Sequence, residues 1–121
     1  MRDYRIVRPV NSLIFISDPA GGQVPEWRPD SLILHTETCI SVACYPEQDG
    51  PTKIVLGLSK EVDPGWAPAL VCELKTPNGA VVVSSAARES FLDMAVASKS
   101  VSVRIWLNDP RWPDQVTIGI A

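Results

Sequence analysis

The chain has 121 residues, of which 45% are hydrophobic and 21% charged, as expected for one globular domain with a core of its own. Eleven Lys and Arg stand against 14 Asp and Glu, giving a net charge of −3 with no basic stripe, so we expect no direct binding to nucleic acid. The longest apolar runs, such as Ala80–Val83, have the length of a strand and are too short to cross a bilayer, so we expect no membrane association.

The first residues contain no apolar segment of the length that an export signal requires. The cysteines are odd in number: Cys39, Cys44 and Cys72. Reduced, buried and inert thiols in a cytoplasmic protein are the simplest interpretation. We expect a single domain that spans residues 1–121.

Short segments rich in Val, Ile, Leu and Thr alternate with Gly and Pro along the chain, which is typical of strands joined by turns. The pattern predicts an all-β fold, a two-layer antiparallel sandwich or a closely related barrel of about eight strands. Leu32–Cys44 is either one strand or two strands broken near Glu37. The predicted strands are Ser12–Ser17, Leu32–Cys44, Thr52–Leu58, Ala69–Lys75, Ala80–Ser84, Phe91–Val96, Ser100–Leu107 and Gln115–Ile120.

The clearest alternation lies in Ser100–Leu107, where Val and Ile at every second position face one side, and Arg104 and Trp106 face the other. Such a period of two predicts a half-buried antiparallel strand. Between two other strands, Thr76–Gly79 contains the Asn-Gly pair that favours a tight hairpin. Ala86–Ala97 also contains good helix formers, so one short helix is the alternative to a strand there.

Three of the four tryptophans lie in loops between prolines: Trp27, Trp66 and Trp112. Because successive antiparallel strands run up and down, these loops emerge at one end of the domain if Leu32–Cys44 is a single strand. If that segment is two strands, Trp27 moves to the other end, and Trp66 and Trp112 stay together. Proline restricts the backbone, so a tryptophan held between prolines loses little further entropy on binding.

We therefore predict a binding surface formed by these tryptophans together with the charged loop residues Asp63, Asp109 and Arg111. Acidic and aromatic loops of this kind can attract a basic partner. The alternative is structural: large aromatic side chains in loops often fold back over the open end of a sandwich, and loop charges are often simply solvated.

No catalytic residues are predicted. The only histidine, His35, lies in a strand-like segment, and the chain contains no nucleophile elbow, phosphate-binding loop or zinc-protease motif. Cys39 and Cys44 are five positions apart, which places them on opposite faces of a single strand, so we expect no metal site. No cofactor is expected either.

The order of elements resembles that of small bacterial proteins of the competence protein J type. The residues that carry the resemblance extend over most of the chain and are Phe15–Asp18, Trp27, Pro77–Val83 and Val101–Trp106. The known member of that family inhibits a DNA-entry nuclease. The resemblance implies an acidic domain without enzymatic activity that binds and blocks a nuclease, but no inhibitory residues transfer to this chain.

Two classes of function follow. The first is a cytoplasmic, non-catalytic protein-binding module, such as an inhibitor or immunity-like partner of a bacterial nuclease or toxin. The second is a sandwich that binds carbohydrate or another small ligand through its loop tryptophans. An enzyme of unfamiliar type, or a homodimer that pairs through an edge strand such as Thr52–Leu58 or Phe91–Val96, is a third alternative.

Overall fold

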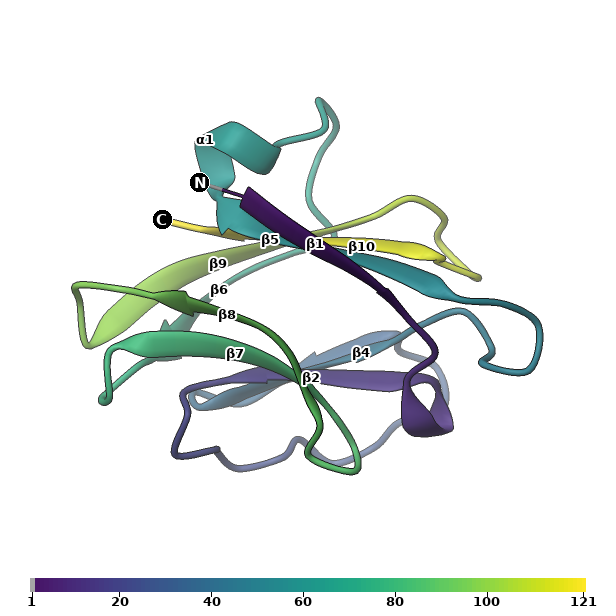
Figure 1. Ribbon diagram of the computed structural model, residues 1–121, viewed down its shortest axis with the longest axis horizontal. Helices are drawn as coiled ribbons and strands as arrows, with labels where there is room; N and C mark the ends of the chain where they lie inside the picture. Colours follow the sequence, from purple (N-terminus) through teal and green to yellow (C-terminus); the bar gives the residue numbers. More distant parts are fainter. Residues whose placement is uncertain (1) are drawn as a thin grey trace.

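The computed structural model describes residues 2–121 as two β-sheets packed face to face (Figure 1). The all-β sandwich is confirmed, and it is not a closed barrel. In chain order its elements are β1 (Arg2–Val7), a 3₁₀ turn (Val10–Ser12), β2 (Leu13–Ser17), β3 (Ile33–His35), β4 (Cys39–Ala43), β5 (Thr52–Leu58), α1 (Ser59–Val62), β6 (Leu70–Lys75), β7 (Ala80–Ser85), β8 (Ser90–Ala95), β9 (Ser100–Leu107) and β10 (Gln115–Ile120).

Sheet A has the strand order β1-β5-β10-β9-β6, and sheet B has the order β3-β4-β2-β7-β8. The described residues form ten strands where the sequence predicted about eight. One difference is that Leu32–Cys44 is divided into β3 and β4, which pair as a hairpin around Glu37. The other is β1, whose side chains are nearly all exposed, so it carries no apolar alternation that sequence inspection could detect.

The core lies between the two sheets and is built by alternate residues of each strand. Ile14 and Ile16 of β2, and Val103 and Ile105 of β9, are fully buried there. This period of two is the one that the sequence predicted, because every second side chain of a strand points to the same face. Within Ala86–Ala97 the structure has a strand and not a helix: Ser90–Ala95 form β8, and a turn precedes it.

The Thr76–Gly79 turn is present, but the hairpin predicted there is wrong. Gly79 has φ of 74°, and its N–H donates to the Thr76 carbonyl, as a tight turn requires. The strands that it joins nevertheless enter different sheets, since β6 pairs with β9 and β7 pairs with β2 and β8. The Asn-Gly pair therefore predicted the turn correctly, but it did not predict which strands β6 and β7 pair with.

The sheets are also not antiparallel throughout. β5 and β10 are parallel neighbours, and β5 leads to β6 through a connection, residues 59–69, that passes over the outer face of sheet A (Figure 1). Residues 18–32 make a similar connection from β2 to β3, which run in the same direction on either side of β4. We call these connections crossover A (residues 59–69) and crossover B (residues 18–32).

Of the two predicted edge strands, only one is an edge. β5 lies inside sheet A because β1 pairs along its whole length, so pairing of two copies through Thr52–Leu58 is excluded. β8 is an edge of sheet B. The Arg5 guanidinium of β1 reaches across to β8 and donates to the carbonyls of Ser90 and Phe91 at 3.3 and 3.4 Å, which joins the two sheets on this side.

Helix is scarce: α1 has four residues, and no helix within residues 2–121 is long and apolar enough to span a membrane.

Candidate functional site

Crossover A builds a second, smaller core on the outer face of sheet A. Trp106 is 1% exposed and packs there with Val55 of β5 and Val62 of α1. Its Nε1–H donates to the backbone carbonyl of Trp66 at 2.8 Å, which ties the crossover to β9. The sequence pattern predicted that Trp106 faces away from the main core. This face is correct, but crossover A covers the side chain and shields it from solvent.

The close fit of α1 against the sheet depends on Gly119 of β10. A Cβ at this position would lie 2.7 Å from Ser59 Oγ and 2.8 Å from Trp106 Cζ3. Glycine is therefore required for the helix and the indole to approach the strand.

Two loops of sheet A carry the same four-residue pattern, Asp-Pro-x-Trp, at residues 63–66 and 109–112. Each aspartate accepts hydrogen bonds from the backbone that follows it. Asp63 Oδ1 accepts the Gly65 N–H at 2.8 Å. Asp109 Oδ1 accepts the N–H groups of Arg111 and Trp112 at 2.9 and 2.8 Å. The two aspartates thus form Asx turns that fix the backbone just before or at each tryptophan.

Both tryptophans point into solvent instead of closing the sandwich. Trp66 is 50% exposed and Trp112 is 56% exposed, while the neighbouring Pro113 is buried and anchors the second loop. The hydrogen bonds from Trp112 and Arg111 outweigh a small opposing effect of burial and, with the Arg111 charge, hold the pKa of Asp109 below its usual value. The acceptor of this turn therefore stays ionised at neutral pH.

The 63–69 loop enters β6 at the end of sheet A where the 108–114 loop leaves β9, since Ala69 N donates to the Ile105 carbonyl. The hydrogen bond from Trp106 fixes the Trp66 backbone beside the last part of β9, and the other loop begins at Asn108, two residues after Trp106. In Figure 1 the connection that follows α1 descends to the start of β6, close to where the chain leaves β9 toward β10. We call residues 63–69 and 108–114 the paired tryptophan loops.

Other apolar side chains are exposed on the outer face of sheet A. Tyr4 and Ile6 of β1 share this face with Val55 and Lys53, their cross-strand partners, and Val71 of β6 lies at the opposite edge. The Lys53 ammonium lies 4.8 Å from the centre of the Tyr4 ring, a cation–π contact. Sheet A thus exposes apolar side chains at both of its edges as well as on the paired tryptophan loops.

Trp27 is placed differently. It lies on crossover B, between two strands of sheet B, and is 69% exposed. Residues 24–30 of this crossover make no hydrogen bond to other described residues, in contrast to the Asp-Pro-x-Trp turns. The prediction assumed that each loop joins the adjacent ends of neighbouring strands. This assumption fails for both crossovers, because each of them runs the length of a sheet.

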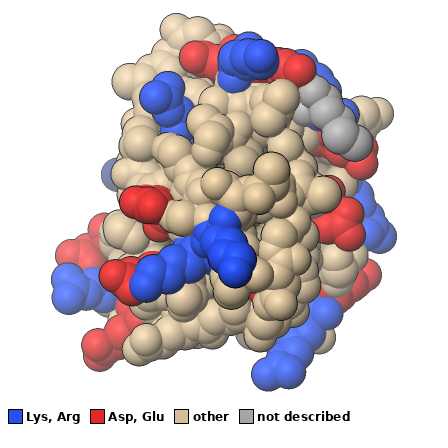
Figure 2. Space-filling view, turned by 90° about the vertical axis from the view of Figure 1, so that its left-hand side faces the viewer, with Lys and Arg blue, Asp and Glu red and all other residues tan. Residues whose placement is uncertain are grey.

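Charged residues complete the predicted site only in part. Asp63 and Asp109 are exposed, but each is engaged in its own turn, so their first role is to hold the backbone. Arg111 is exposed beside Trp112. On the face seen in Figure 2, acidic and basic side chains are interspersed with uncharged ones and form no field of a single sign.

The remaining candidates for chemistry are inert in this fold. Burial raises the pKa of the Cys39 thiol to about 11 and that of Cys44 to about 12, and it also raises that of Cys72. All three cysteines are free. Within residues 2–121 no group of three or more His, Cys, Asp and Glu side chains is arranged to hold a metal ion, and His35 is exposed on edge strand β3.

The repeated Asp-Pro-x-Trp pattern is a signal in the sequence that the flanking prolines alone do not reveal. Comparing the two loops position by position would have revealed it. The hydrogen bond between Trp106 and Trp66 had no such signal, since it joins residues 40 positions apart.

Comparison with known proteins gives a likeness of fold. No family model matches the chain, and no curated protein matches its sequence. Among solved structures, ComJ from Bacillus subtilis, described as an inhibitor of the DNA-degrading activity of NucA, superimposes with a TM-score of 0.71. The match covers 98% of this chain and 93% of ComJ at 9% sequence identity. The structural resemblance to this type of protein is therefore confirmed at the level of the fold.

Proposed function

We propose that this chain is a non-catalytic protein-binding domain, an inhibitor-like partner of a nuclease, and that it binds through the paired tryptophan loops. The observation that carries the proposal is the repeated turn: two aspartates each hold a loop that exposes a tryptophan, at one end of one sheet.

Tryptophan is the side chain most enriched at the centres of protein interfaces, where it supplies a large apolar area with few rotatable bonds. A loop whose backbone is already fixed by an Asx turn and by proline loses little entropy when it binds. The exposed Tyr4, Ile6 and Val71 on the same sheet would extend the contact beyond the two indole rings. Exposed apolar surface of this kind is characteristic of binding sites.

The fold supports the choice of partner. ComJ, which has the same fold over nearly its whole length, is described as an inhibitor of the nuclease NucA. The negative net charge of this chain disfavours binding to DNA itself, so inhibition would act through contact with the enzyme. We further propose a cytoplasmic location, in keeping with three free cysteines whose thiols are wholly or partly buried.

The test is an inhibition titration against a NucA-like nuclease from the source organism, followed by cleavage of labelled DNA. We expect the wild-type chain to suppress cleavage in proportion to its concentration. Trp66→Ala and Trp112→Ala should each weaken inhibition by roughly thirtyfold, the loss of one interface hot spot. Trp27→Ala is the matched control, because it removes an even more exposed indole from a loop without an Asx turn, and it should inhibit like the wild type.

Full inhibition by the double variant Trp66→Ala/Trp112→Ala would refute the proposed surface. An absence of inhibition by the wild type would refute the nuclease as partner. Affinity capture from the extract of the source cell, with the double variant and the Trp27→Ala variant in parallel, then tests protein binding as such.

Carbohydrate binding is the second candidate, favoured by the exposure of the two indole rings, which could stack on sugar rings. Tryptophan fluorescence titrated with soluble glycans distinguishes the two functions. A shift that Trp66→Ala and Trp112→Ala abolish would favour sugar binding, whereas no change over a broad panel would exclude it for this surface.

A further inference from the structure

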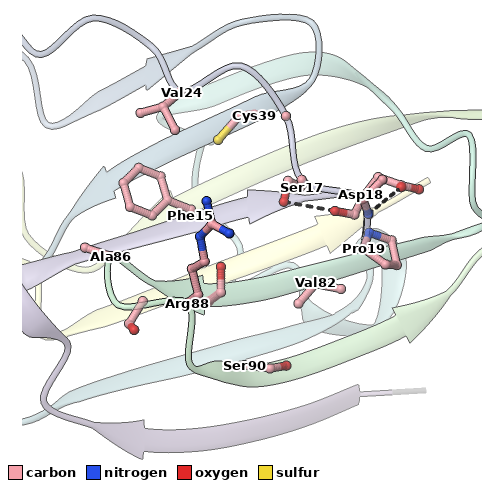
Figure 3. A pocket seen from close by; sticks show the side chains of 15 residues that line it. Phe15, Ser17, Asp18, Pro19, Val24, Cys39, Val82, Ala86, Arg88 and Ser90 are labelled. Carbon is pink, nitrogen blue, oxygen red and sulfur yellow. Dashed lines mark hydrogen bonds between the residues drawn. The ribbon is translucent and has the colours of Figure 1, made fainter.

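A groove crosses the outer face of sheet B (Figure 3). The paired tryptophan loops belong to the other sheet of the sandwich. It has a volume of about 730 Å³. Its floor consists of the residues of β2, β4 and β7 that point away from the core, and it combines apolar side chains with hydroxyl groups. These residues are Phe15, Ser17, Cys39, Val82 and Ser84.

The first wall of the groove is the beginning of crossover B, residues 18–24, and Asp18 fixes it. This carboxylate is almost completely buried and accepts hydrogen bonds from Asn78 N at 2.8 Å, Asn78 Nδ2 at 2.6 Å and Ala20 N at 3.0 Å. Burial acts to raise the pKa of Asp18, but these hydrogen bonds together outweigh it and hold the pKa below its usual value. Asp18 is thus a structural anion whose oxygens are already occupied.

Glycine and threonine continue the first wall. Gln23 N donates to Thr38 Oγ1 at 2.8 Å, and the Gln23 carbonyl accepts from Thr36 Oγ1 at 2.7 Å. Gly22 lies so close to the β3–β4 turn that a Cβ on it would lie 2.2 Å from the Thr38 carbonyl oxygen. The wall is therefore held against the hairpin before any ligand arrives.

The second wall is the turn from β7 to β8, residues 85–90, and Ser85 builds it. The buried Ser85 Oγ accepts the N–H groups of Ala87 and Glu89, each at 3.1 Å, while the Ser85 carbonyl accepts the Arg88 N–H at 2.9 Å. These bonds hold Arg88 in the left-handed region, at φ of 64°. A residue other than glycine adopts this conformation uncommonly, and here the three hydrogen bonds to Ser85 maintain it.

The turn directs a positive charge into the groove. In Figure 3 the Arg88 side chain points from the turn toward Phe15. Within residues 2–121 its guanidinium has no hydrogen-bond or ion-pair partner. Arg5 contributes a second positive charge near this end, since its guanidinium lies 3.3 Å from the carbonyl oxygen of Ser90. Because Asp18 is already satisfied, the groove presents an unpaired cation without a competing free anion on its lining.

We propose that this groove binds an extended, acidic segment of a protein partner, with an Asp or Glu carboxylate of that segment paired to Arg88. A guanidinium matches a carboxylate with two parallel hydrogen bonds. An extended segment presents every second side chain to the floor, where Phe15 and Val82 accept apolar groups and the serines accept polar ones. Both walls are built in advance, so binding orders little of this chain.

An extended segment fits better than a small anion. Val24, Ala86 and Arg88 on the rim are exposed, so the groove is open to solvent and would leave much of a small ligand in water. A segment that belongs to a larger partner gains contacts beyond the groove. This site is separate from the paired tryptophan loops and does not depend on the function proposed for them.

The test uses two blocked pentapeptides, Gly-Val-Glu-Val-Gly and its Gln counterpart, titrated into the isotope-labelled full chain and followed by NMR. We expect the Glu peptide to shift the amides of Phe15, Ser84 and Ser90, with an affinity about tenfold higher than that of the Gln peptide. Arg88→Gly should remove this preference. Glycine adopts φ of 64° without strain, so this variant keeps the turn. Arg111→Ala, which removes an equally exposed arginine at the paired tryptophan loops, is the control and should bind like the wild type.

Three results would overturn the proposal. They are equal binding of the Glu and Gln peptides, binding of the Glu peptide that Arg88→Gly leaves unchanged, and an absence of shifts at the groove residues at millimolar peptide. Binding of free acetate as tight as that of the Glu peptide would likewise contradict an extended occupant.

Discussion

Crossovers A and B make the same kind of connection but pack differently on their sheets. Each carries the chain along the outer face of a sheet to begin a strand that runs in the same direction as the one before. Crossover A packs on sheet A and buries Trp106 beneath it, whereas crossover B leaves a groove between itself and the outer face of sheet B.

The difference follows from the side chains that face outward under each crossover. Beneath crossover A the sheet offers Trp106 and Val55, and Val62 of α1 closes over them. Beneath crossover B the outward-facing side chains are Phe15 and Val82 together with serine hydroxyls and the small Cys39, a more polar set over which the crossover does not close. A long connection over a sheet thus becomes a second core or a site according to what lies below it.

Of the substitutions that test this difference between the crossovers, removal of the Trp106 side chain should have the largest effect. Trp106→Ala deletes the centre of the core under crossover A and should lower the free energy of unfolding by about 3–5 kcal/mol. Chemical denaturation followed by circular dichroism measures the loss. Trp106→Phe keeps much of the apolar volume, loses the hydrogen bond to Trp66, and should cost clearly less. Equal costs for the two variants would show that the buried area under crossover A contributes little.

On the other side, crossover B depends on a buried charge. Asp18→Asn removes the ionised acceptor and should cost about 1.5–3 kcal/mol near neutral pH, the usual value for hydrogen bonds to a charged group. Because the folded-state pKa of Asp18 is lowered, its contribution is fully present above the unfolded value of 3.8 and is lost as the pH falls through the folded pKa. The stability difference between wild type and variant should therefore shrink below about pH 3.8; a difference that stays constant to lower pH would contradict this role.

A finer test concerns how tightly α1 is packed. Gly119→Ala forces a methyl group against Ser59 and Trp106 and should destabilise the fold by about 1–3 kcal/mol. Gly50→Ala is the control, since the nearest atom to its Cβ is Tyr45 Cε2 at 3.3 Å, the edge of a side chain that can move. If thermal unfolding showed the same small change for both variants, the close approach of α1 would not be essential.

The smallest expected effects are those of the exposed indoles on stability. Trp66→Ala and Trp112→Ala should each change the free energy of unfolding by no more than about 0.5 kcal/mol, as is usual for exposed positions. The carbonyl of Trp66 that accepts from Trp106 belongs to the backbone and survives the substitution. A large loss in denaturant unfolding would mean that these indoles are structural and not presented for binding.

The sequence was sufficient for the part of the fold that local side-chain period controls. Alternation in Ser100–Leu107 and Gln115–Ile120 identified the strands and their inner faces correctly. A strand that is buried on one face has an apolar side chain at every second residue, and this pattern can be detected in the sequence. It missed β1, an exposed strand that is held by pairing with β5 and has no apolar stripe.

The pairing between strands could not be predicted from the sequence. The Asn78-Gly79 turn gives no sign that β6 and β7 separate into two sheets, since β6 pairs with β9 and β7 pairs with β2, strands distant in the sequence. The burial of Trp106 likewise depends on a crossover that the strand pattern does not encode.

The candidate sites divide in the same way. Exposed tryptophans between prolines could be selected by inspection, and the structure places Trp66 and Trp112 on fixed loops of sheet A. The groove on sheet B could not, because its lining comes from several separated segments and its charge depends on the left-handed turn at Arg88.

The central claim is that the fixed tryptophan loops of sheet A are where a protein partner binds. Hydrogen exchange of this chain, free and in complex with the nuclease or with the partner captured from the source cell, tests it most directly. We predict that binding slows exchange in residues 63–69 and 108–114. Slowed exchange confined to residues 76–79 and 96–99, at the opposite end of the sandwich, with both loops unchanged, would contradict the account.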